Sequence, residues 1–413
     1  MIAFLDTNVK KRARQQRVIR AAAPLLARAG WDGRGVEAAL LAEARDPLLD
    51  AQIRAEASVA SSLAAQQTNL QNAGICLDEL IRFSAAPNGL NGLDADLSKL
   101  FSSFETLSGD PANVPLRRRI VRSAEDIAAK FNRASSRLDG LKNDLNASIQ
   151  EDVVRANQDL SDIAGLNRRI MESQAWGGRA GTLAGQRGQH LKSLAGRVNI
   201  IATRRADGGV NVSIGGVAMV CGAKTPDSLA TYPDQNDNLR IQAQNAGTRL
   251  KPAGGSIAGK ITARDGGLAG LQSGLNALAS QLITRVNSIY SSGCESNSGA
   301  GRDFFTGTGA SDIGVNSTVA DDPSQLQAVG AAPALETFGQ SYARTVTNLG
   351  GALLKVSDDL SSSRAVTQML ANERDSARGV SLGAEWTDLQ RYRQACAASA
   401  QVHATLIEML PVQ

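Results

Sequence analysis

The sequence predicts an α+β fold that is mainly α: an elongated, discontinuous helical bundle or coiled-coil domain with a small inserted β domain. Three observations favour this class. No proline occurs between Pro115 and Pro226, and apolar or alanine side chains recur there at steps of four and three, from Ile120 to Ile170. A short segment further along alternates apolar and polar residues, as β-strands do, before helical spacing returns.

The helical pattern is longest between residues 120 and 170. Its members are Ile120, Ala124, Ile127, Phe131, Ala134, Leu138, Leu141, Leu145, Ile149, Val153, Ala156, Leu160, Ile163, Leu166 and Ile170. Because an α-helix rises 1.5 Å per residue, a seam of this length makes a rod of roughly 75 Å. Such a rod is typical of a spacer or an assembly element and not of the wall of an active-site cleft.

Composition limits the classes of protein to consider. The chain has 413 residues, enough for two or three domains, and 42% of them are hydrophobic but only 4% aromatic, which favours slim cores. The formal net charge of +4 is nearly balanced, so it gives no argument for a nucleic-acid partner. No run of apolar residues is long enough to span a bilayer, so no membrane insertion is expected.

Residues 1–33 are predicted to form a basic N-terminal arm. Its cations are Lys10, Lys11, Arg12, Arg14, Arg17, Arg20 and Arg28. A solvated arm is the favoured interpretation, and a phosphate-binding arm is the alternative. The start does not have the pattern of a cleaved signal peptide. The cysteines are far apart, so we expect neither a disulfide framework nor a zinc site.

The whole chain is predicted to divide into seven parts. They are a basic arm (1–33), a first part of the helical rod domain (34–190), a β-rich insert (191–255), a second rod part (256–292), a surface loop (293–333), a third rod part (334–380) and a C-terminal assembly helix (381–413). The rod domain is therefore assembled from segments that are distant in the sequence.

The first elements follow from local start and stop signals. The apolar run Val36–Leu41 fits a short strand or the lead-in to a helix. Asp46-Pro47 is a helix-start signal, so a helix is expected from there to about Ala86. A short helix with apolar residues from Leu93 to Leu107 follows, and a turn at residues 110–115 opens the rod.

The β insert follows the end of the rod. Residues 176–185 break the rod, and a short helix is expected near residues 186–196. The strands are then expected as one compact meander, at 198–200, 210–214, 217–221 and 239–243. The glycine doublets at 177–178, 208–209, 215–216, 254–255 and 266–267 are assigned to turns, because none of them fits a phosphate-binding loop.

Helical spacing returns from Ile257 to Ile289. Residues 291–333 are rich in small and polar residues and are predicted to be a surface loop with one short strand near 312–316. A helix is expected at 334–372, and a final helix from Leu382 to Leu410.

The final helix carries an apolar stripe, which is the candidate site of contact with partner proteins. The contact residues are Leu382, Trp386, Leu389, Tyr392, Cys396, Leu406 and Leu410. The stripe fits either an intramolecular core or a face exposed to partners. The second interpretation is favoured, because a terminal helix without a local partner cannot bury such a stripe within the chain.

The sequence gives no indication of catalysis. His190 and His403 are the only histidines, and they lie on separate predicted helices without a pattern of cysteines or carboxylates around them. Asp46 and Asp50 are explained by helix capping and not by an acidic site. We therefore expect no enzymatic activity, no cofactor and no metal.

Several blocks of sequence, in order, resemble one known family. They include Arg45-Asp46-Pro47-Leu48-Leu49-Asp50-Ala51-Gln52, Ile163-Ala164-Gly165-Leu166-Asn167-Arg168-Arg169-Ile170, Gln186-Arg187-Gly188-Gln189-His190-Leu191, Gly209-Val210-Asn211-Val212-Ser213-Ile214-Gly215-Gly216, Gly254-Gly255-Ser256-Ile257-Ala258-Gly259, Asp303-Phe304-Phe305 and Gly379-Val380-Ser381-Leu382. Together they cover almost everything from residue 30 onward. They resemble the bacterial flagellar hook-associated protein 1 family, the hook-filament junction proteins.

The resemblance implies a structural role. Members of that family are exported by the flagellar type III apparatus and polymerise into a ring that joins hook to filament. It implies four partners: further copies of the chain, the hook protein, the second hook-filament junction protein and an export chaperone. It also implies a secreted, extracellular location in the flagellum, with the chain cytoplasmic before export.

The chain also departs from the family pattern. The family begins with an additional helix before the segment that matches Asn8-Val9, so this sequence is similar to an N-terminally truncated or divergent member. The alternative from another class is a coiled-coil scaffold or signalling protein with a β sensing module. An enzyme such as a wall hydrolase ranks third, because no acid pair or nucleophile can be named.

Overall fold

The computed structural model describes residues 34–77, 93–176, 180–293, 303–326 and 336–378, and a few helical residues between 390 and 401. The chain divides into two units. One comprises Met1–Ile53 and Gln368–Gln413, and the other Arg54–Thr367. Helices α2 (Arg34–Cys76) and α10 (Glu336–Arg378) each continue from one unit into the other. The predicted seven-part division stays a prediction.

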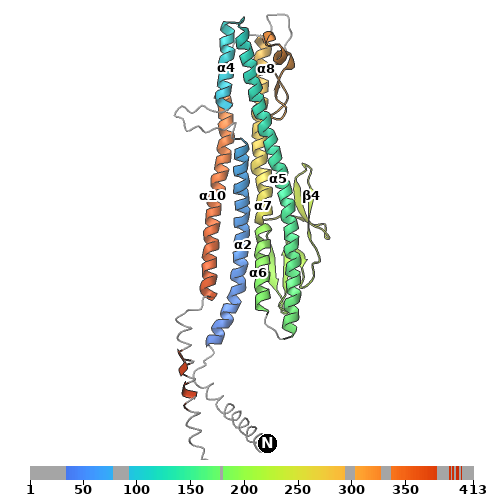
Figure 1. Cartoon of the computed structure of the whole chain (residues 1–413), viewed down its shortest axis with the longest axis vertical. Coiled ribbons are helices and arrows are strands. Elements are labelled where there is room, and N and C mark those ends of the chain that lie inside the picture. Colours follow the sequence, from blue (N-terminus) through green and yellow to red (C-terminus); the bar gives the residue numbers. More distant parts are fainter. Residues whose placement is uncertain are drawn as a thin grey trace, which may run out of the picture. The chain divides into compact units, whose positions relative to one another are not determined.

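The predicted class is confirmed: the fold is mainly helical, with small antiparallel sheets inserted between helices. After α2 the helices are α4 (Leu93–Gly109), α5 (Val114–Ala175), α6 (Gly181–Arg197), α7 (Gly255–Thr262), a π-helical turn (Ala263–Leu268) and α8 (Ala269–Gly293). Figure 1 shows α4 beside the N-terminal part of α5, and α6 and the sheet containing β4 beside its C-terminal part.

The long helix predicted from the apolar period is present as α5. Every member of the predicted series is buried except Leu141, which is partly buried against the same core. The helix begins where the side chain of Asn113 accepts a hydrogen bond from the Leu116 amide at 3.0 Å, with Pro115 in the first turn. It ends at Ala175, where Trp176 caps it, as the glycines that follow predict.

Two hydrophobic cores succeed one another along α5. The first includes residues up to Leu145 together with α4, α8 and parts of α2 and α10. The second begins at Ile149 and includes α6, α7 and both larger sheets. Helix α5 therefore connects a helical bundle to a β-bearing layer, and its stripe changes packing partners near the middle.

Segments distant in sequence pack together within the Arg54–Thr367 unit. The Ser363 hydroxyl on α10 lies 3.4 Å from a Glu56 carboxylate oxygen on α2. Gly74 lies next to Leu349 further along the same two helices, so α2 and α10 are antiparallel here. Helix α7 approaches α2 most closely at Gly259, where a β-carbon would overlap the Ser62 carbonyl oxygen.

The β insert differs from the single meander that the sequence predicted. It contains two separate three-stranded antiparallel sheets. One consists of β1 (Ile201–Arg204), β2 (Val210–Ile214) and β3 (Val217–Val220), and the other of β4 (Leu229–Pro233), β5 (Leu239–Ala243) and β6 (Arg249–Leu250).

The first expected strand was misplaced, and β4 and β6 were missed. Val198 caps α6, and the strand begins three residues later at Ile201. Strand β4 has no strict apolar alternation and ends at a proline, and β6 has only two residues, so neither gives a local signal.

The glycine doublets 208–209 and 215–216 occupy turns, as predicted, and Gly254-Gly255 lies at the start of α7. Gly208, Gly215, Gly216 and Gly255 have φ between +57° and +86°, a region that glycine adopts without strain. Gly266-Gly267 is an exception, because both residues lie inside the π-helical turn. The doublet at 177–178 lies outside the described residues.

The start of α2 corrects a second prediction. The helix begins at Arg34, so Val36–Leu41 is helical and Asp46-Pro47 lies inside the helix instead of starting it. A proline in a helix removes only one backbone donor, and good helix formers on both sides continue the helix past it. The predicted end near Ala86 lies outside the described residues.

Residues 303–326 contain the short strand predicted near 312–316 but have more regular structure than the surface loop that their composition predicted. They form β7 (Phe305–Thr306), β8 (Gly314–Val315), α9 (Ser317–Asp321) and a 3₁₀ turn (Pro323–Gln325). Phe304 and Phe305 are at most 1% exposed and pack edge to face in the first core. The burial of these two aromatic side chains stabilises a folded segment here, although most residues around them are polar.

Asp227 holds the loop between β5 and β6 against the start of β4. Its carboxylate accepts backbone hydrogen bonds from Ser228 (2.7 Å), Asn245 (2.8 Å) and Ala246 (3.0 Å). Burial alone raises the pKa of this carboxyl, but the backbone hydrogen bonds outweigh it and hold the pKa below the usual aspartate value.

Asp227→Asn is expected to lower the free energy of unfolding by about 2 kcal/mol at neutral pH, because an amide nitrogen cannot accept the third hydrogen bond. A lowered folded-state pKa stabilises the fold above the unfolded pKa of about 3.9, and this stabilisation is lost as pH falls through the folded pKa. Urea unfolding at several pH values should therefore show that the difference in the free energy of unfolding between the parent and Asp227→Asn becomes smaller in acid. A gap that is constant down to acid pH would contradict this role.

Candidate functional site

The apolar stripe predicted as the contact site lies outside the described residues. This holds for all seven of its members, Leu382, Trp386, Leu389, Tyr392, Cys396, Leu406 and Leu410. Within the described residues, the candidate functional site is the set of polar contacts that attaches the β sheets to α5.

Three asparagines on α5 hold the starts of three strands. Asn146, Asn157 and Asn167 are about three helical turns apart, so they lie near one face of the helix. Each side chain makes hydrogen bonds with the backbone of the sheet layer through both its oxygen and its nitrogen. The residues that they bind are Leu239, Leu229 and Val210, which are the first residues of β5, β4 and β2.

We call this arrangement, in which both the oxygen and the nitrogen of one asparagine side chain bind backbone at the start of a strand, an asparagine clasp. Asn157 makes the simplest one. Its Oδ1 accepts from the Leu229 amide and its Nδ2 donates to the Leu229 carbonyl, both at 2.8 Å. The side chain thus pairs with β4 as a neighbouring strand would. This contact explains how a strand with a weak sequence signal is positioned.

Asn146 makes the clasp at the start of β5. Its Nδ2 donates to the Asp237 carbonyl and its Oδ1 accepts from the Leu239 amide, both at 3.2 Å. The guanidinium of Arg264 donates to the same Oδ1 at 2.6 Å and to the Leu239 carbonyl at 3.0 Å. The π-helical turn that carries Arg264 is thereby fixed to both α5 and β5.

Asn167 is the most buried of the three and is fully inaccessible to solvent. Its Nδ2 donates to the carbonyls of Val210 and Gly222 at 2.7 Å, and its Oδ1 accepts from the Val210 amide at 3.0 Å. Arg187 of α6 donates to this Oδ1 at 2.9 Å and to the Gly208 carbonyl at 2.7 Å. One side chain therefore joins α5, α6, the start of β2 and the turn that follows β3.

Burial, with a smaller effect of the nearby charge of Arg204, lowers the pKa of Arg187. A buried guanidinium needs its acceptors, so Asn167 and the Gly208 carbonyl are required partners and not incidental contacts.

Ion pairs reinforce the same attachment from α6 and α7. Asp159 of α5 lies 2.6 Å from Arg197 Nη1 and 3.0 Å from His190 Nδ1. Lys260 of α7 lies 2.7 Å from Asp152 Oδ2, which also accepts from Ser256 at 2.6 Å. Helices α6 and α7 are therefore both tied to α5 by charged groups.

The environment of His190 adds to the sequence analysis, which found no pattern of cysteines or carboxylates that would make a metal site or a triad with it. Asp159 and, at 3.7 Å, Asp162 face it from the neighbouring helix, a contact that spacing within α6 cannot reveal. His403 lies outside the described residues. Among the residues that the structure describes, no group of His, Cys, Asp and Glu side chains is arranged to hold a metal ion.

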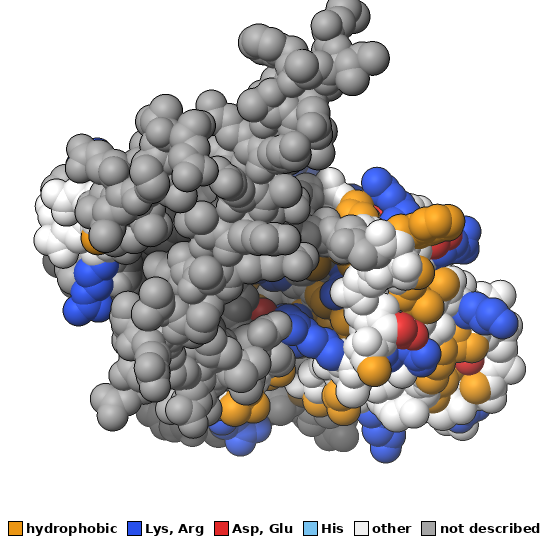
Figure 2. All heavy atoms as spheres, turned by 90° about the horizontal axis from the view of Figure 1, so that it is seen from below, with side chains coloured by type: hydrophobic (Ala, Val, Ile, Leu, Met, Phe, Trp, Pro, Cys, Tyr) orange, Lys and Arg blue, Asp and Glu red, His pale blue; other side chains and the backbone are white. Residues whose placement is uncertain are grey.

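Two of the cysteines lie in the described part of the chain. Cys76 is partly buried and Cys221 is exposed, and both are free thiols. Burial raises the pKa of Cys76. None of the described helices has the length and hydropathy of a membrane span. Figure 2 views the molecule from below relative to Figure 1. On the described part of the surface seen there, Lys and Arg side chains are dispersed between apolar areas.

Sequence reasoning missed the asparagine clasps, although a signal was present. The three asparagines recur with the helical period close to a stripe that is otherwise apolar, and the block Leu166-Asn167 contributed to the family resemblance. A buried amide on an apolar face indicates a specific polar contact, because an unpaired amide there is costly.

The chain was compared with known families and proteins. A family model described as "Flagellar hook-associated protein FlgK helical domain" matches residues 85–305. Flagellar hook-associated protein 1 of Salmonella typhimurium (strain LT2) is 24% identical over 331 residues, which cover 78% of this chain and 58% of that protein. The protein of the same name from Escherichia coli (strain K12) is 25% identical over 309 residues, covering 72% and 55%.

A solved structure shows the same fold. It is that of the flagellar hook junction protein FlgK from Burkholderia pseudomallei, with a TM-score of 0.54 and 22% identity, covering 62% of this chain and 46% of that chain. The chain thus spans somewhat more than half the length of the curated relatives above.

Proposed function

Because the chain belongs to the flagellar hook-associated protein FlgK family, we propose that it is a structural component of the bacterial flagellum that joins hook to filament by subunit polymerisation. The observation that carries this proposal is the family match over residues 85–305, more than half of the chain. That range contains α5 and both of the larger sheets that it holds.

The architecture supports a mechanical and non-enzymatic role. A long helix that is fixed to a β layer by amide clasps and ion pairs transmits force without a hinge at the attachment. Most of the described polar groups at the attachment bind backbone or each other, and Arg264 Nη2 is a buried exception without a hydrogen-bond partner among the described residues.

The partners proposed for this role are those of a junction subunit. They are further copies of the chain in a ring, the hook protein, the second hook-filament junction protein and an export chaperone. The proposed location is extracellular, in the flagellum, after export from the cytoplasm. The C-terminal stripe from Leu382 to Leu410 is the proposed contact for subunits or the chaperone.

Alanine at Leu389, Tyr392, Leu406 and Leu410 together is expected to weaken chaperone or subunit binding at least tenfold, because apolar anchors supply most of the binding energy of such a helix. Isothermal titration of the purified chain with its export chaperone measures this. The matched control replaces four exposed polar residues of the same helix with alanine: Gln390, Arg393, Gln394 and Ser399. Equal loss of binding in both variants, or in neither, would contradict the contact.

Deletion of the gene in its own bacterium tests the junction role. The expected result is cells that carry hooks without filaments and release filament protein into the medium, with filaments restored by the intact gene. Normal filaments in the deletion strain would overturn the proposed function.

A further inference from the structure

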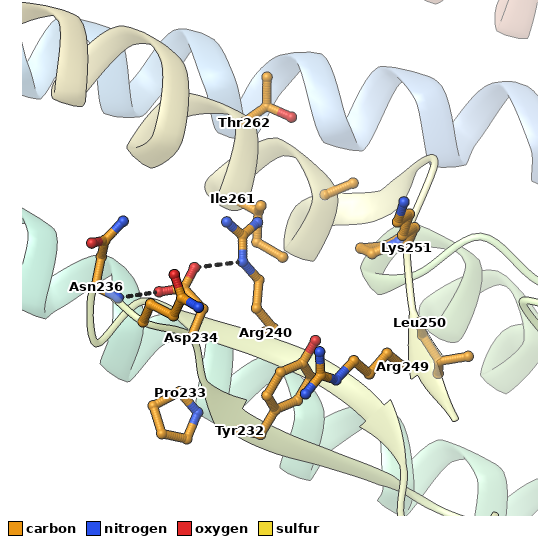
Figure 3. A pocket seen from close by; sticks show the side chains of 13 residues that line it. Tyr232, Pro233, Asp234, Asn236, Arg240, Arg249, Leu250, Lys251, Ile261 and Thr262 are labelled. Carbon is orange, nitrogen blue, oxygen red and sulfur yellow. Dashed lines mark hydrogen bonds and ion pairs between the residues drawn. The ribbon is translucent and has the colours of Figure 1, made fainter. Parts of the chain in front are cut away.

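A groove lies between the β4–β5–β6 sheet and α7, on the side of the sheet layer shown in Figure 3. Its volume is about 910 Å³. The apolar part of its lining consists of Leu250, Ala258, Ile261, Pro233 and Pro252. A groove of this size is larger than a single side chain needs, and it accommodates an extended segment of a few residues.

The charges in the groove are not balanced. Asp234 is fully engaged: it accepts from the Asn236 and Asn238 amides at 2.9 and 3.1 Å and from Arg240 at 3.0 Å. Burial alone raises the pKa of Asp234, but these hydrogen bonds and the charge of Arg240 outweigh it and lower the pKa, so the carboxylate stays ionised. Arg240 in turn pairs with Asp265 at 2.6 Å.

Two further cations at the groove, Arg249 and Lys251, have no ion-pair partner in the described part of the chain. The guanidinium of Arg249 lies 5.1 Å from the centre of the Tyr232 ring and stacks on it (Figure 3). Stacking holds the group in place and leaves its N–H groups available for a bidentate carboxylate.

We infer that this groove is the docking site of an extended acidic segment of a partner protein, with its carboxylates on Arg249 and Lys251 and its apolar side chains on Ile261 and Pro252, which are both partly exposed. Charge complementarity selects the occupant, because the fixed acid is neutralised while the cations beside it are not. The position also suits a peptide, since β6 is the edge strand of its sheet.

This inference is independent of the junction role. The aliphatic and proline lining favours a protein segment over a nucleic acid, whose bases stack on aromatic faces, because Arg249 already lies over the Tyr232 ring. A protein segment with alternating acidic and apolar residues presents both on opposite sides when extended.

Fluorescence anisotropy with the full chain tests the inference. The probe is a short labelled peptide of alternating glutamate and leucine, and the comparison peptide has lysine in place of glutamate. The acidic peptide is expected to bind, and the basic one to bind at least about tenfold more weakly. Binding of the acidic peptide should also weaken as salt is added.

Charge reversal locates the contact. R249E/K251E is expected to weaken binding of the acidic peptide at least about tenfold and to strengthen binding of the basic one. The matched control, R118E/R119E, reverses two exposed arginines in the first turns of α5 and should bind as the parent does. R249Q/K251Q, which adds no new charge, should weaken the acidic peptide without gaining the basic one.

Three results would overturn the inference. They are equal binding of the two peptides by the parent, unchanged binding by R249E/K251E, and equal weakening by R118E/R119E. Displacement of the acidic peptide by a short single-stranded DNA, from the parent and from R118E/R119E alike, would assign the two cations to nucleic acid instead.

Discussion

Asn167→Leu is expected to lower the free energy of unfolding of the Arg54–Thr367 unit by about 4 kcal/mol. Leucine has the same number of side-chain heavy atoms in the same branched arrangement, so the change removes the polar contacts without leaving a cavity. It removes the side-chain partner of the Val210 amide and of two carbonyls, and one of the two acceptors of the buried Arg187 guanidinium. Buried groups deprived of a hydrogen bond cost more than the bond itself contributes.

Urea unfolding measures the effect, and Gln158→Leu is the matched control. Gln158 is an exposed amide on the same helix, whose side chain reaches only Asp162, one turn away. The control should stay within about 0.5 kcal/mol of the parent. Similar midpoints for the two variants would show that Asn167 is not a structural clasp.

Gly259→Val is expected to destabilise the same unit by at least about 3 kcal/mol, because helices α7 and α2 are in backbone contact at this point. A β-carbon at Gly259 would overlap the Ser62 carbonyl oxygen and lie 2.9 Å from the Ala65 β-carbon. Neither obstacle is the end of a flexible side chain, so the helices must separate.

Thermal and urea unfolding of Gly259→Val should be compared with Gly140→Val. Gly140 lies in the exposed middle of α5, and a β-carbon there meets nothing within 4 Å. Valine is a better helix former than glycine, so this control is expected to be stabilised by a few tenths of a kcal/mol. Effects of equal size and sign in both variants would refute the close approach of α7 to α2.

The helical part of the fold could be predicted because burial along a helix repeats with the helical period. The series from Ile120 to Ile170 is visible in the sequence alone, and its burial on α5 is confirmed. The resemblance to the junction-protein family is confirmed by the family match and the relatives.

Two of the misses, strand β4 and the segment around Phe304, share one physical cause, which is that contacts between distant segments override weak local signals. Strand β4 is set by Asn157, which lies more than seventy residues earlier in the chain. The turn containing Phe304 and Phe305 is held by Asn287, whose Oδ1 accepts from both of their amides at 3.0 and 2.8 Å. Local composition predicted a loop there, and only the tertiary contact shows otherwise.

The C-terminal stripe stays a prediction for a related reason. An apolar face on a terminal helix gives the same pattern whether it meets its own chain, a second copy or a chaperone. The variant with alanine at Leu389, Tyr392, Leu406 and Leu410 tests whether the face binds a partner.

The location of the chain in assembled flagella tests the central claim most directly. Immunogold labelling of an epitope-tagged chain, viewed by electron microscopy on isolated hook-filament structures, measures it. The account predicts gold confined to the boundary between hook and filament. Gold distributed along the filament, or none on the hook-filament structures, would contradict it.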